Sequence, residues 1–233
     1  LERDDVEVVL ISTPPATHYP LALRALQAGK HVIVEKPIAL ETAQADELIA
    51  RAGEKRLLLA VDHMLRYNAL LNLAGEIIES GLLGAPLHFF FENYAEDERL
   101  PDDHWFWDRG QSGGIFVEHA VHFFDLYRKW FGDLEVLAAH KETRPGTEKI
   151  DRVWCALRAK GSILGTHYHG FDQTYRLDRA DHRILFERGD LTINGWIPGR
   201  LGLHGIVDSE EKARLDEMLG DCGLEIIAEY KGC

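Results

Sequence analysis

The sequence predicts an α/β fold, in which a parallel sheet with crossover helices is followed by an α+β domain with a mostly antiparallel sheet. Over residues 1–65, short β-branched runs alternate with helical patterns, which is typical of right-handed βαβ units. From about residue 66 onward, β-type segments follow one another with few helices between them, which is typical of antiparallel pairing. The 233 residues are 45% hydrophobic and 28% charged, an ordinary composition for globular domains. We therefore expect two domains, residues 1–65 and residues 66–233.

The first βαβ unit is predicted within residues 6–35. Residues 6–12, VEVVLIS, form an almost continuous apolar run that is typical of a buried strand. A helix is expected from Thr17, which can cap its first turn, to Gly29, which permits a left-handed stop. Residues 31–35, HVIVE, form the second strand.

The second unit continues the same pattern. A helix is expected over residues 41–52 with Gly53 as its stop, and a third strand over residues 57–61. We expect helices to cover both faces of this parallel sheet. Ligands of open parallel sheets gather at the carboxyl ends of the strands, so residues 12–14 and 35–37 are candidate ligand-binding loops.

The remainder of the chain has a different pattern. Helices are expected over residues 70–80 and 114–130, with an aromatic strand over residues 87–94 and a loop carrying Trp105 and Trp107 between them. Further β-type segments are expected at residues 134–141, 153–159, 163–168, 183–187 and 191–193. No element is predicted for residues 199–233.

The charge balance argues against two classes of partner. Lys and Arg number 26 against 39 for Asp and Glu, a formal charge of −13, and so acidic a surface repels phosphate backbones and anionic lipid. No stretch approaches the roughly 18 apolar residues of a membrane span, and no secretory signal is expected. Cys155, Cys222 and Cys233 lie far apart without a CxxC pair. We therefore expect neither nucleic acid nor membrane as a partner, and a cytoplasmic location.

The helix over residues 114–130 carries the first candidate site. Glu118, His122 and Asp125 are spaced i, i+4 and i+7, so they share one stripe on an otherwise apolar helix. These three side chains are either the solvent-exposed face of the helix or a set of functional groups in a cleft. The functional interpretation is favoured because a carboxylate one turn from a histidine can orient the imidazole and tune its charge for acid/base chemistry.

Lys36 is the second candidate, because it stands at the carboxyl end of a predicted strand between Glu35 and Pro37. An X-Pro bond at that position is a candidate for the cis form, and the alternative is an ordinary surface lysine. A metal site formed by His119 and His122 is a further alternative, since histidines at i and i+3 can chelate. The order of residues does not fit HExxH and no third ligand is evident, so no metal is expected.

Residues 8–37, which contain TPPATH, AGKHV and EKP, and residues 112–125, SGGIFVEHAVHFFD, resemble the Gfo/Idh/MocA family of glucose–fructose oxidoreductases and inositol dehydrogenases. Residues 8–37, VVLISTPPATHYPLALRALQAGKHVIVEKP, are similar to the end of the family's Rossmann-type nucleotide-binding domain, with its TP-x-x-x-H loop, AGKHV strand entry and EKP motif. Residues 112–125, SGGIFVEHAVHFFD, are similar to the second signature of the family, GG-x-x-x-D-x-G-x-H-x-x-D. The resemblance covers roughly residues 5–195.

The resemblance implies an oxidoreductase that uses NAD or NADP and acts on a sugar, polyol or inositol-like substrate. Lys36 matches the lysine that contacts the cofactor ribose and the reacting hydroxyl, and His122 matches the proton acceptor. Glu118 stands where the family usually has Asp, and Ala120 where it usually has Gly. The residues expected to contact the cofactor are Thr13, Pro14, His18, Glu35 and Lys36, and those expected to line the substrate pocket are Arg66, Trp107, His122 and Asp125.

Two further expectations follow from the resemblance. The sequence contains no GxGxxG motif, so we expect the chain to lack the first half of the nucleotide-binding domain and the residues that distinguish NAD from NADP. Members of the family pair through the antiparallel sheet, which implies a homo-oligomer. The departures at Glu118 and Ala120 leave one alternative, a non-catalytic relative that binds a sugar or cofactor as a regulator or scaffold.

Overall fold

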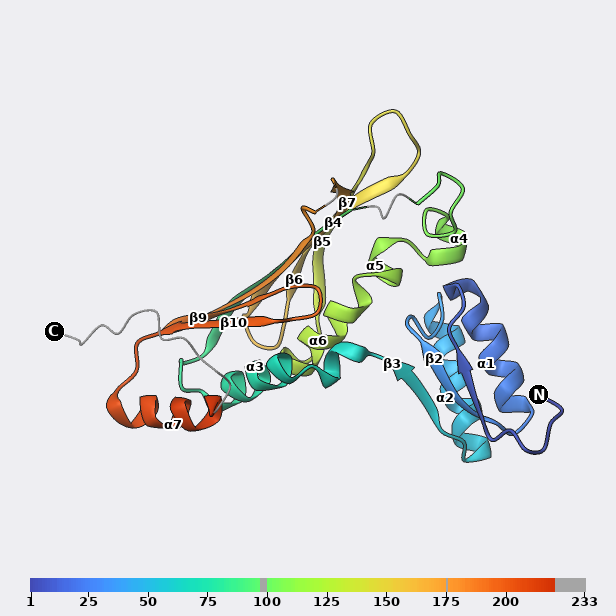
Figure 1. The fold of residues 1–233 in the computed structure, drawn as a ribbon, viewed down its shortest axis with the longest axis horizontal. Coiled ribbons are helices and arrows are strands. Elements are labelled where there is room, and N and C mark those ends of the chain that lie inside the picture. Colours follow the sequence, from blue (N-terminus) through green and yellow to red (C-terminus); the bar gives the residue numbers. More distant parts are fainter. Residues whose placement is uncertain (97–99, 175, 221–233) are drawn as a thin grey trace.

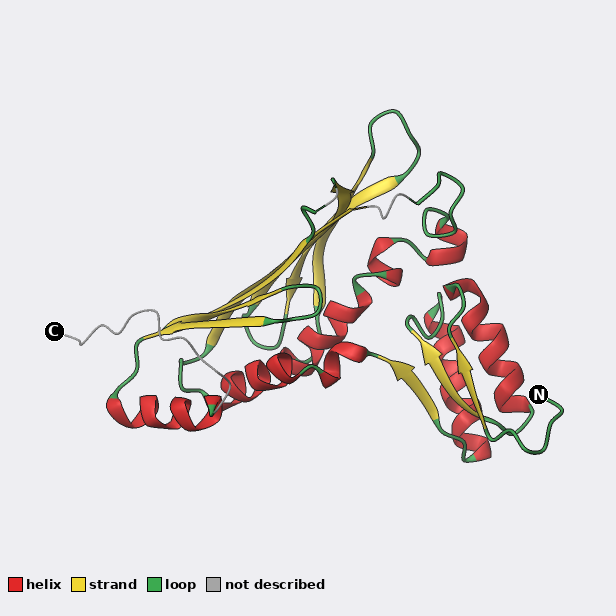
Figure 2. Ribbon diagram, viewed as in Figure 1, coloured by secondary structure: helices red, strands yellow, loops and turns green. Residues whose placement is uncertain are grey.

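Two sheets organise the part of the chain that the structure, a computed structural model, describes: residues 1–96, 100–174 and 176–220 (Figures 1 and 2). One sheet is parallel with the strand order β1-β2-β3. The other has seven strands in the order β10-β9-β8-β4-β7-β6-β5. Its pairs are antiparallel except for β4 with β7. The predicted fold class is therefore confirmed. Cys222 and Cys233 lie outside the described residues, and Cys155 is a buried free thiol.

Strands and helices alternate in the N-terminal unit, and both strand pairs are parallel. The first strand ends at Ile11, before the prolines at 14 and 15, and a single 3-10 turn, η1, leads into the first helix. The elements are β1 (Val8–Ile11), η1 (Pro15–Thr17), α1 (His18–Gln27), β2 (His31–Glu35), α2 (Thr42–Lys55) and β3 (Leu59–Asp62).

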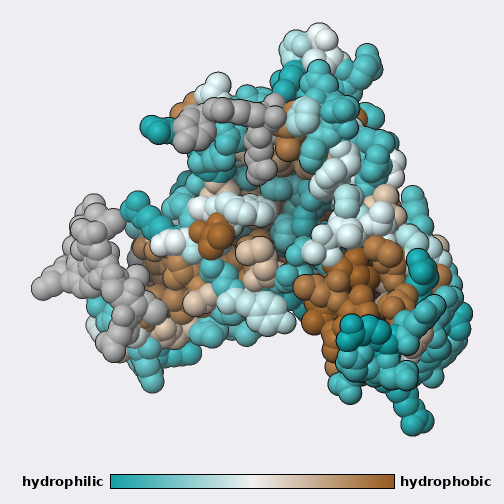
Figure 3. All heavy atoms as spheres, turned by 45° about the vertical axis from the view of Figure 1, so that its right-hand side comes forward, coloured by the Kyte–Doolittle hydropathy of each residue, from teal (hydrophilic) through white to brown (hydrophobic). Residues whose placement is uncertain are grey.

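Both helices lie against the same face of the parallel sheet, where Leu26 and Leu48 pack with Val34 in one core. Right-handed crossovers that always step in the same direction place every helix on one side. On the other face Leu10 is 67% exposed and Ile33 41%, and an apolar area is visible over this unit in Figure 3. For the described residues, the prediction of helices on both faces is therefore wrong, and β1 is not a buried strand.

The ends of the two helices depart from the prediction in detail. The Thr17 hydroxyl donates to the Pro14 carbonyl, 2.8 Å away, and does not cap α1. Gly29 adopts the predicted left-handed conformation with φ 75°. Gly53 does not end α2, because the helix continues to Lys55 and Arg56 supplies the left-handed residue at φ 55°.

The second unit begins with short helices and then forms the large sheet. A β-bulge interrupts the pairing of β5 with β6, and β10 and α7 fall in the segment for which no element was predicted. The elements are η2 (Met64–Tyr67), α3 (Ala69–Ser80), β4 (Pro86–Glu96), α4 (Arg109–Ser112), α5 (Ile115–Glu118), α6 (Val121–Phe131), β5 (Glu135–Thr143), β6 (Ile150–Arg158), β7 (Leu164–Gln173), β8 (Arg179–Phe186), β9 (Gly189–Asn194), β10 (Arg200–Gly205) and α7 (Ser209–Leu219).

Helices α3, α6 and α7 cover one face of the large sheet (Figure 1). Phe89 and Phe91 of β4 point into that core, and Phe91 stacks on Phe123 of α6 with ring centroids 3.7 Å apart. On the opposite face, no described helix covers the alternating residues of β4, β6 and β7, which include Phe90, Trp154 and several half-exposed neighbours. This packing therefore fixes α6 on the large sheet, with its N-terminus toward the parallel sheet.

Candidate active site

The carboxyl end of β2 meets the junction of α5 and α6 at Lys36. The Lys36 ammonium donates to the carbonyl oxygen and to carboxylate Oε1 of Glu118, each 2.7 Å away. Both side chains are only 13% exposed. The Lys36–Pro37 peptide bond is cis. Residues 82 positions apart are thus joined by a charge-assisted hydrogen bond, which is stronger than a neutral one.

The helix that was predicted as one element over residues 114–130 is broken between Glu118 and Val121. In an uninterrupted helix the Glu118 carbonyl would accept from the backbone N–H of His122. Here that carbonyl accepts from Lys36, so the break supplies an acceptor to the site. Glu118 was expected to orient His122, but the side-chain partner that the structure gives it is Lys36.

His122 lies in the first turn of α6 and is 5% exposed. Burial, followed by the positive charge of Lys36, lowers the pKa of His122 to about 3. Its Nδ1 atom is buried without a hydrogen-bond partner among the described residues. At neutral pH the imidazole is therefore uncharged.

Asp125, one turn further along α6, anchors the segment that follows β3. Its carboxylate accepts two hydrogen bonds from the Arg66 guanidinium, both 2.6 Å long, and lies 3.8 Å from His63 Nδ1. The bond to Asp125 raises the pKa of Arg66, while burial lowers the pKa of His63. Two of the predicted pocket residues, Arg66 and Asp125, are thus brought together as a bidentate pair.

His18 joins the two candidate ligand-binding loops to each other. It is 1% exposed, with Nδ1 2.7 Å from the Pro37 carbonyl oxygen and Nε2 2.6 Å from the Thr13 carbonyl oxygen. The ring therefore connects the loop after β1 to the loop after β2. Thr13 itself is exposed, and its hydroxyl lies 2.6 Å from that of Thr17.

Pro14 and Glu35 complete the predicted set at this edge of the sheet. Pro14 directly precedes η1, and Glu35 ends β2 opposite Asp62 of β3, and both are partly buried. The segments after β2 and β3 contact α5 and α6 through the pairs Lys36–Glu118 and Arg66–Asp125. The loop after β1 is joined to the loop after β2 through His18.

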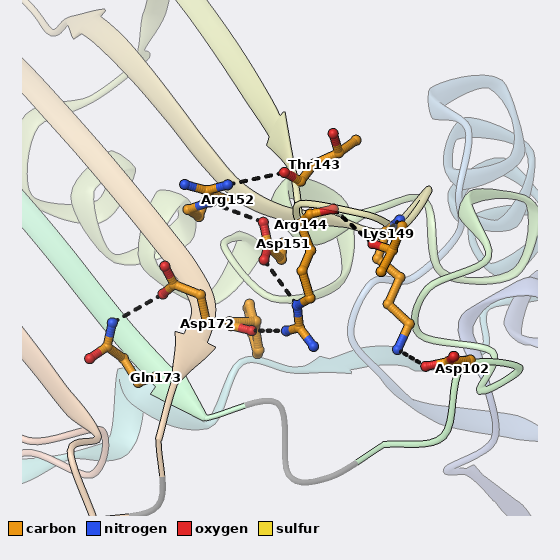
Figure 4. A network of polar contacts seen from close by, with 10 residues as sticks. Asp102, Thr143, Arg144, Lys149, Asp151, Arg152, Asp172 and Gln173 are labelled. Carbon is orange, nitrogen blue, oxygen red and sulfur yellow. Dashed lines mark hydrogen bonds and ion pairs between the residues drawn. The ribbon is translucent and has the colours of Figure 1, made fainter.

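Trp107 lies in a different environment from the other predicted pocket residues. Lys149 and Arg144 pack against its ring at 4.9 and 5.6 Å from the centroid. These cations belong to an ion-pair network at the β5–β6 turn, in which Arg144 also binds Asp151 (Figure 4). Among the described residues, the aromatic rings that contact His122 are those of Phe123 and Trp196, and Trp107 is not one of them.

Two residues at the site were not predicted from the sequence. Trp196, on the turn after β9, stacks on His119 with ring centroids 4.9 Å apart and approaches His122 at 5.5 Å. His63 follows β3 directly, so the rule that selected Lys36 could also have selected it. The dipeptide Asn194-Gly195 is a turn signal that places Trp196 on a loop, but not beside His122.

Within residues 1–96, 100–174 and 176–220, no group of three or more His, Cys, Asp or Glu side chains could hold a metal ion. No helix in those same ranges is long and apolar enough to cross a membrane.

The fold joins a parallel sheet of the nucleotide-binding type to a second unit with a large mixed sheet, and protein-family models match both parts. Residues 1–63 match a model described as oxidoreductase family, NAD-binding Rossmann fold. Residues 72–192 match the GFO/IDH/MocA C-terminal domain. The chain therefore belongs to the Gfo/Idh/MocA oxidoreductase family, as its sequence motifs predicted.

Three curated relatives share between 27% and 35% of their aligned residues with this chain. The uncharacterized oxidoreductase YdgJ of Escherichia coli is 34% identical over 151 residues, which are 63% of this chain and 42% of that protein. UDP-N-acetylglucosamine 3-dehydrogenase of Acidithiobacillus ferrooxidans is 35% identical over 52% of this chain and 35% of its own length. scyllo-Inositol 2-dehydrogenase (NAD(+)) of Bacillus subtilis is 27% identical over 57% of this chain and 37% of its own length. The chain thus spans less than half of these relatives.

Solved structures show the same fold at lower identity. WlbA dehydrogenase from Bordetella pertussis, in complex with NADH and UDP-GlcNAcA, superposes with a TM-score of 0.77 at 22% identity, over 95% of this chain and 66% of that one. Levoglucosan dehydrogenase in complex with NADH and levoglucosan superposes with a TM-score of 0.75 at 21% identity, over 89% of this chain and 62% of that one.

Proposed function

We propose that this chain carries the nicotinamide-facing and substrate-binding parts of an NAD(P)-dependent oxidoreductase. The reaction is hydride transfer between the nicotinamide and a hydroxyl-bearing carbon of a sugar, polyol or inositol-like substrate. The observation that carries the proposal is the convergence of Lys36, Glu118 and His122 from two domains on one partly buried spot. Relatives named for dehydrogenation of scyllo-inositol and of UDP-N-acetylglucosamine support the substrate class.

The residues at the strand ends fit the nicotinamide half of such a cofactor. An ammonium group has three N–H donors, and Glu118 accepts two of those of Lys36, so one is left for a ribose hydroxyl or a substrate oxygen. Thr13, Pro14 and Glu35 lie on the same edge of the sheet and would contact the cofactor. When bound, the nicotinamide supplies the hydride acceptor.

His122 acts as the proton acceptor in this proposal. Its neutral ring takes the proton of the substrate hydroxyl as the C–H bond breaks. Lys36 stabilises the negative charge that develops on the oxygen, and Glu118 holds the Lys36 ammonium at that oxygen. Asp125 raises the pKa of His122 and so opposes the lowering by burial and Lys36.

The test is nicotinamide reduction with a panel of substrates. The protein is incubated with NAD⁺ or NADP⁺ and with myo-inositol, scyllo-inositol, glucose, sorbitol or UDP-N-acetylglucosamine, and the absorbance of the reduced nicotinamide is followed. Mass spectrometry should show a product that has lost two hydrogen atoms. Saturable sugar or cofactor binding without any reduction would refute the catalytic proposal and favour the non-catalytic relative.

A further inference from the structure

Trp196 is the most exposed of the five tryptophans in the sequence, with 38% of its surface accessible, although it lies beside His122. A large aromatic side chain loses hydrophobic stabilisation when it stays in water. An indole that is left accessible next to a buried proton acceptor is therefore a candidate contact for the ligand on which that acceptor works.

The turn that carries Trp196 is held at several points. The N–H of Gly195 donates to the Ala180 carbonyl at 2.8 Å, and the N–H of Gly199 donates to the Asn194 carbonyl at 3.2 Å. Gly195 has φ 104°, and a Cβ there would lie 2.9 Å from the Ile197 carbonyl oxygen. This turn consequently requires glycine at position 195 and presents Trp196 in a defined place.

Packing holds the indole ring as well as the backbone. His119 stacks on Trp196 at 4.9 Å with an interplanar angle of 15°, while Phe123 meets it at 5.3 Å and 66°. Burial lowers the pKa of His119 to about 3, so the ring stacked on Trp196 is neutral. These ring contacts leave 38% of the Trp196 residue accessible to a ligand.

We propose that Trp196 forms an aromatic subsite for the C–H face of a cyclic polyol, such as a pyranose or a cyclitol, bound beside His122. This inference rests on the proposed function and specifies the substrate class. A ring-shaped polyol has an apolar C–H face and a hydroxyl rim, so it can pack on the indole and still offer a hydroxyl to polar groups. His122 and the remaining donor of Lys36 are those polar groups.

The shape of the ligand follows from this arrangement. An open-chain polyol has the same hydroxyl groups as a cyclic one but no preformed C–H face, and it loses more conformational freedom on binding. The subsite should therefore favour cyclic over open-chain polyols.

Equilibrium binding tests the subsite without relying on turnover. Saturation-transfer NMR is recorded with myo-inositol, glucose and sorbitol on the wild-type protein and on Trp196→Leu, Trp196→Phe and Trp154→Phe. Trp154 lies on the opposite face of the large sheet and is the matched control. In the wild-type protein we expect saturation transfer to the ring C–H protons of the cyclic ligands. The Kd for these ligands should rise about tenfold in Trp196→Leu and stay within about threefold of wild type in Trp196→Phe. It should be unchanged in Trp154→Phe.

Three outcomes would overturn the subsite: wild-type affinity for cyclic ligands in Trp196→Leu, equal affinity of the wild type for myo-inositol and sorbitol, or no binding of cyclic ligands. In turnover assays, an increase of KM with little change in kcat is expected, whereas a loss of kcat at unchanged Kd would show that Trp196 only supports His122. If Trp196→Leu does not fold by circular dichroism, transfer from irradiated indole protons in the wild type decides. Absence of nicotinamide reduction would refute the proposed function and leave these binding results standing.

Discussion

Acid should weaken the second domain through the histidines buried under its sheet, and His167 allows the effect to be measured. His167 is fully buried on β7, and neither ring nitrogen has a hydrogen-bond partner among the described residues. Burial lowers its pKa from 6.5 to about 3. His182 on β8 is 1% exposed, and burial lowers its pKa to about 3 in the same way.

The sign and size of the effect follow from proton linkage. Between pH 6.5 and pH 3 the unfolded chain binds protons on these rings and the folded chain does not, so the free energy of unfolding falls as the pH falls. At about pH 5.5 each ring lowers the free energy of unfolding by about 1.4 kcal/mol relative to neutral pH, or about 3 kcal/mol for the two. Total stabilities are about 5–15 kcal/mol, so the loss is measurable.

The perturbation is His167→Phe, since Phe124 and Tyr127 already surround the ring with centroids 4.9 Å away. Urea unfolding at about pH 7.5 and about pH 5.5 should show a difference in unfolding free energy that is about 1.4 kcal/mol smaller in the variant. His204→Phe, whose native side chain is 81% exposed, is the control and should keep the wild-type difference. If His167→Phe shows the same difference in unfolding free energy between the two pH values as the wild type, the argument that this ring is buried in its neutral form is refuted.

Four further predictions concern the site and the assembly. His122→Ala should lower turnover about 10²–10⁴-fold while cofactor affinity stays nearly unchanged, because only the proton acceptor is lost. Lys36→Met should weaken cofactor binding and slow hydride transfer together, and should raise the pKa of His122 in the pH–rate profile because the nearby positive charge is gone. His18→Gln should weaken nicotinamide binding in a fluorescence titration and lower the unfolding free energy by about 1–3 kcal/mol, because both N–H groups of an amide leave one nitrogen and cannot reach the two carbonyl oxygens that lie at opposite nitrogens of the ring. The protein should be a dimer or larger in light scattering, and Phe90→Glu on the uncovered face of the large sheet should shift it toward the monomer.

Each of these predictions has a contrary result. Wild-type turnover in His122→Ala would remove that residue from the mechanism, and His204→Ala is the exposed control. Wild-type binding and rate in Lys36→Met would show a bystander lysine. Reduced stability with unchanged nicotinamide affinity in His18→Gln would mean that the bridge has only a structural role. A strictly monomeric wild-type protein at tens of micromolar would contradict pairing through the sheet.

Local pattern was sufficient for most of the elements. The strands over residues 8–11 and 31–35 are predictable because β-branched apolar runs followed by proline fix a strand and its end within a few residues. Lys36 was identified by the same reasoning, since the carboxyl end of a parallel strand is a place where ligands bind. The resemblance to a family then added the roles that are proposed for Lys36 and His122, which no periodicity could supply.

Tertiary structure decided the break between α5 and α6, because the acceptor freed there binds Lys36, 82 residues earlier in the chain. Helical periodicity gives no sign of such a break, since it describes only neighbours along one helix. The placement of Trp196 against His119 likewise depends on the pairing of β9 with β8 and β10. In the described part of the chain, one face of the parallel sheet is uncovered because the strand order β1-β2-β3 places both crossover helices on the same side. The sequence pattern determines whether each segment forms a helix or a strand. Contacts between distant segments determine which side chains lie together at the site, and the chemistry proposed for the site depends on those contacts.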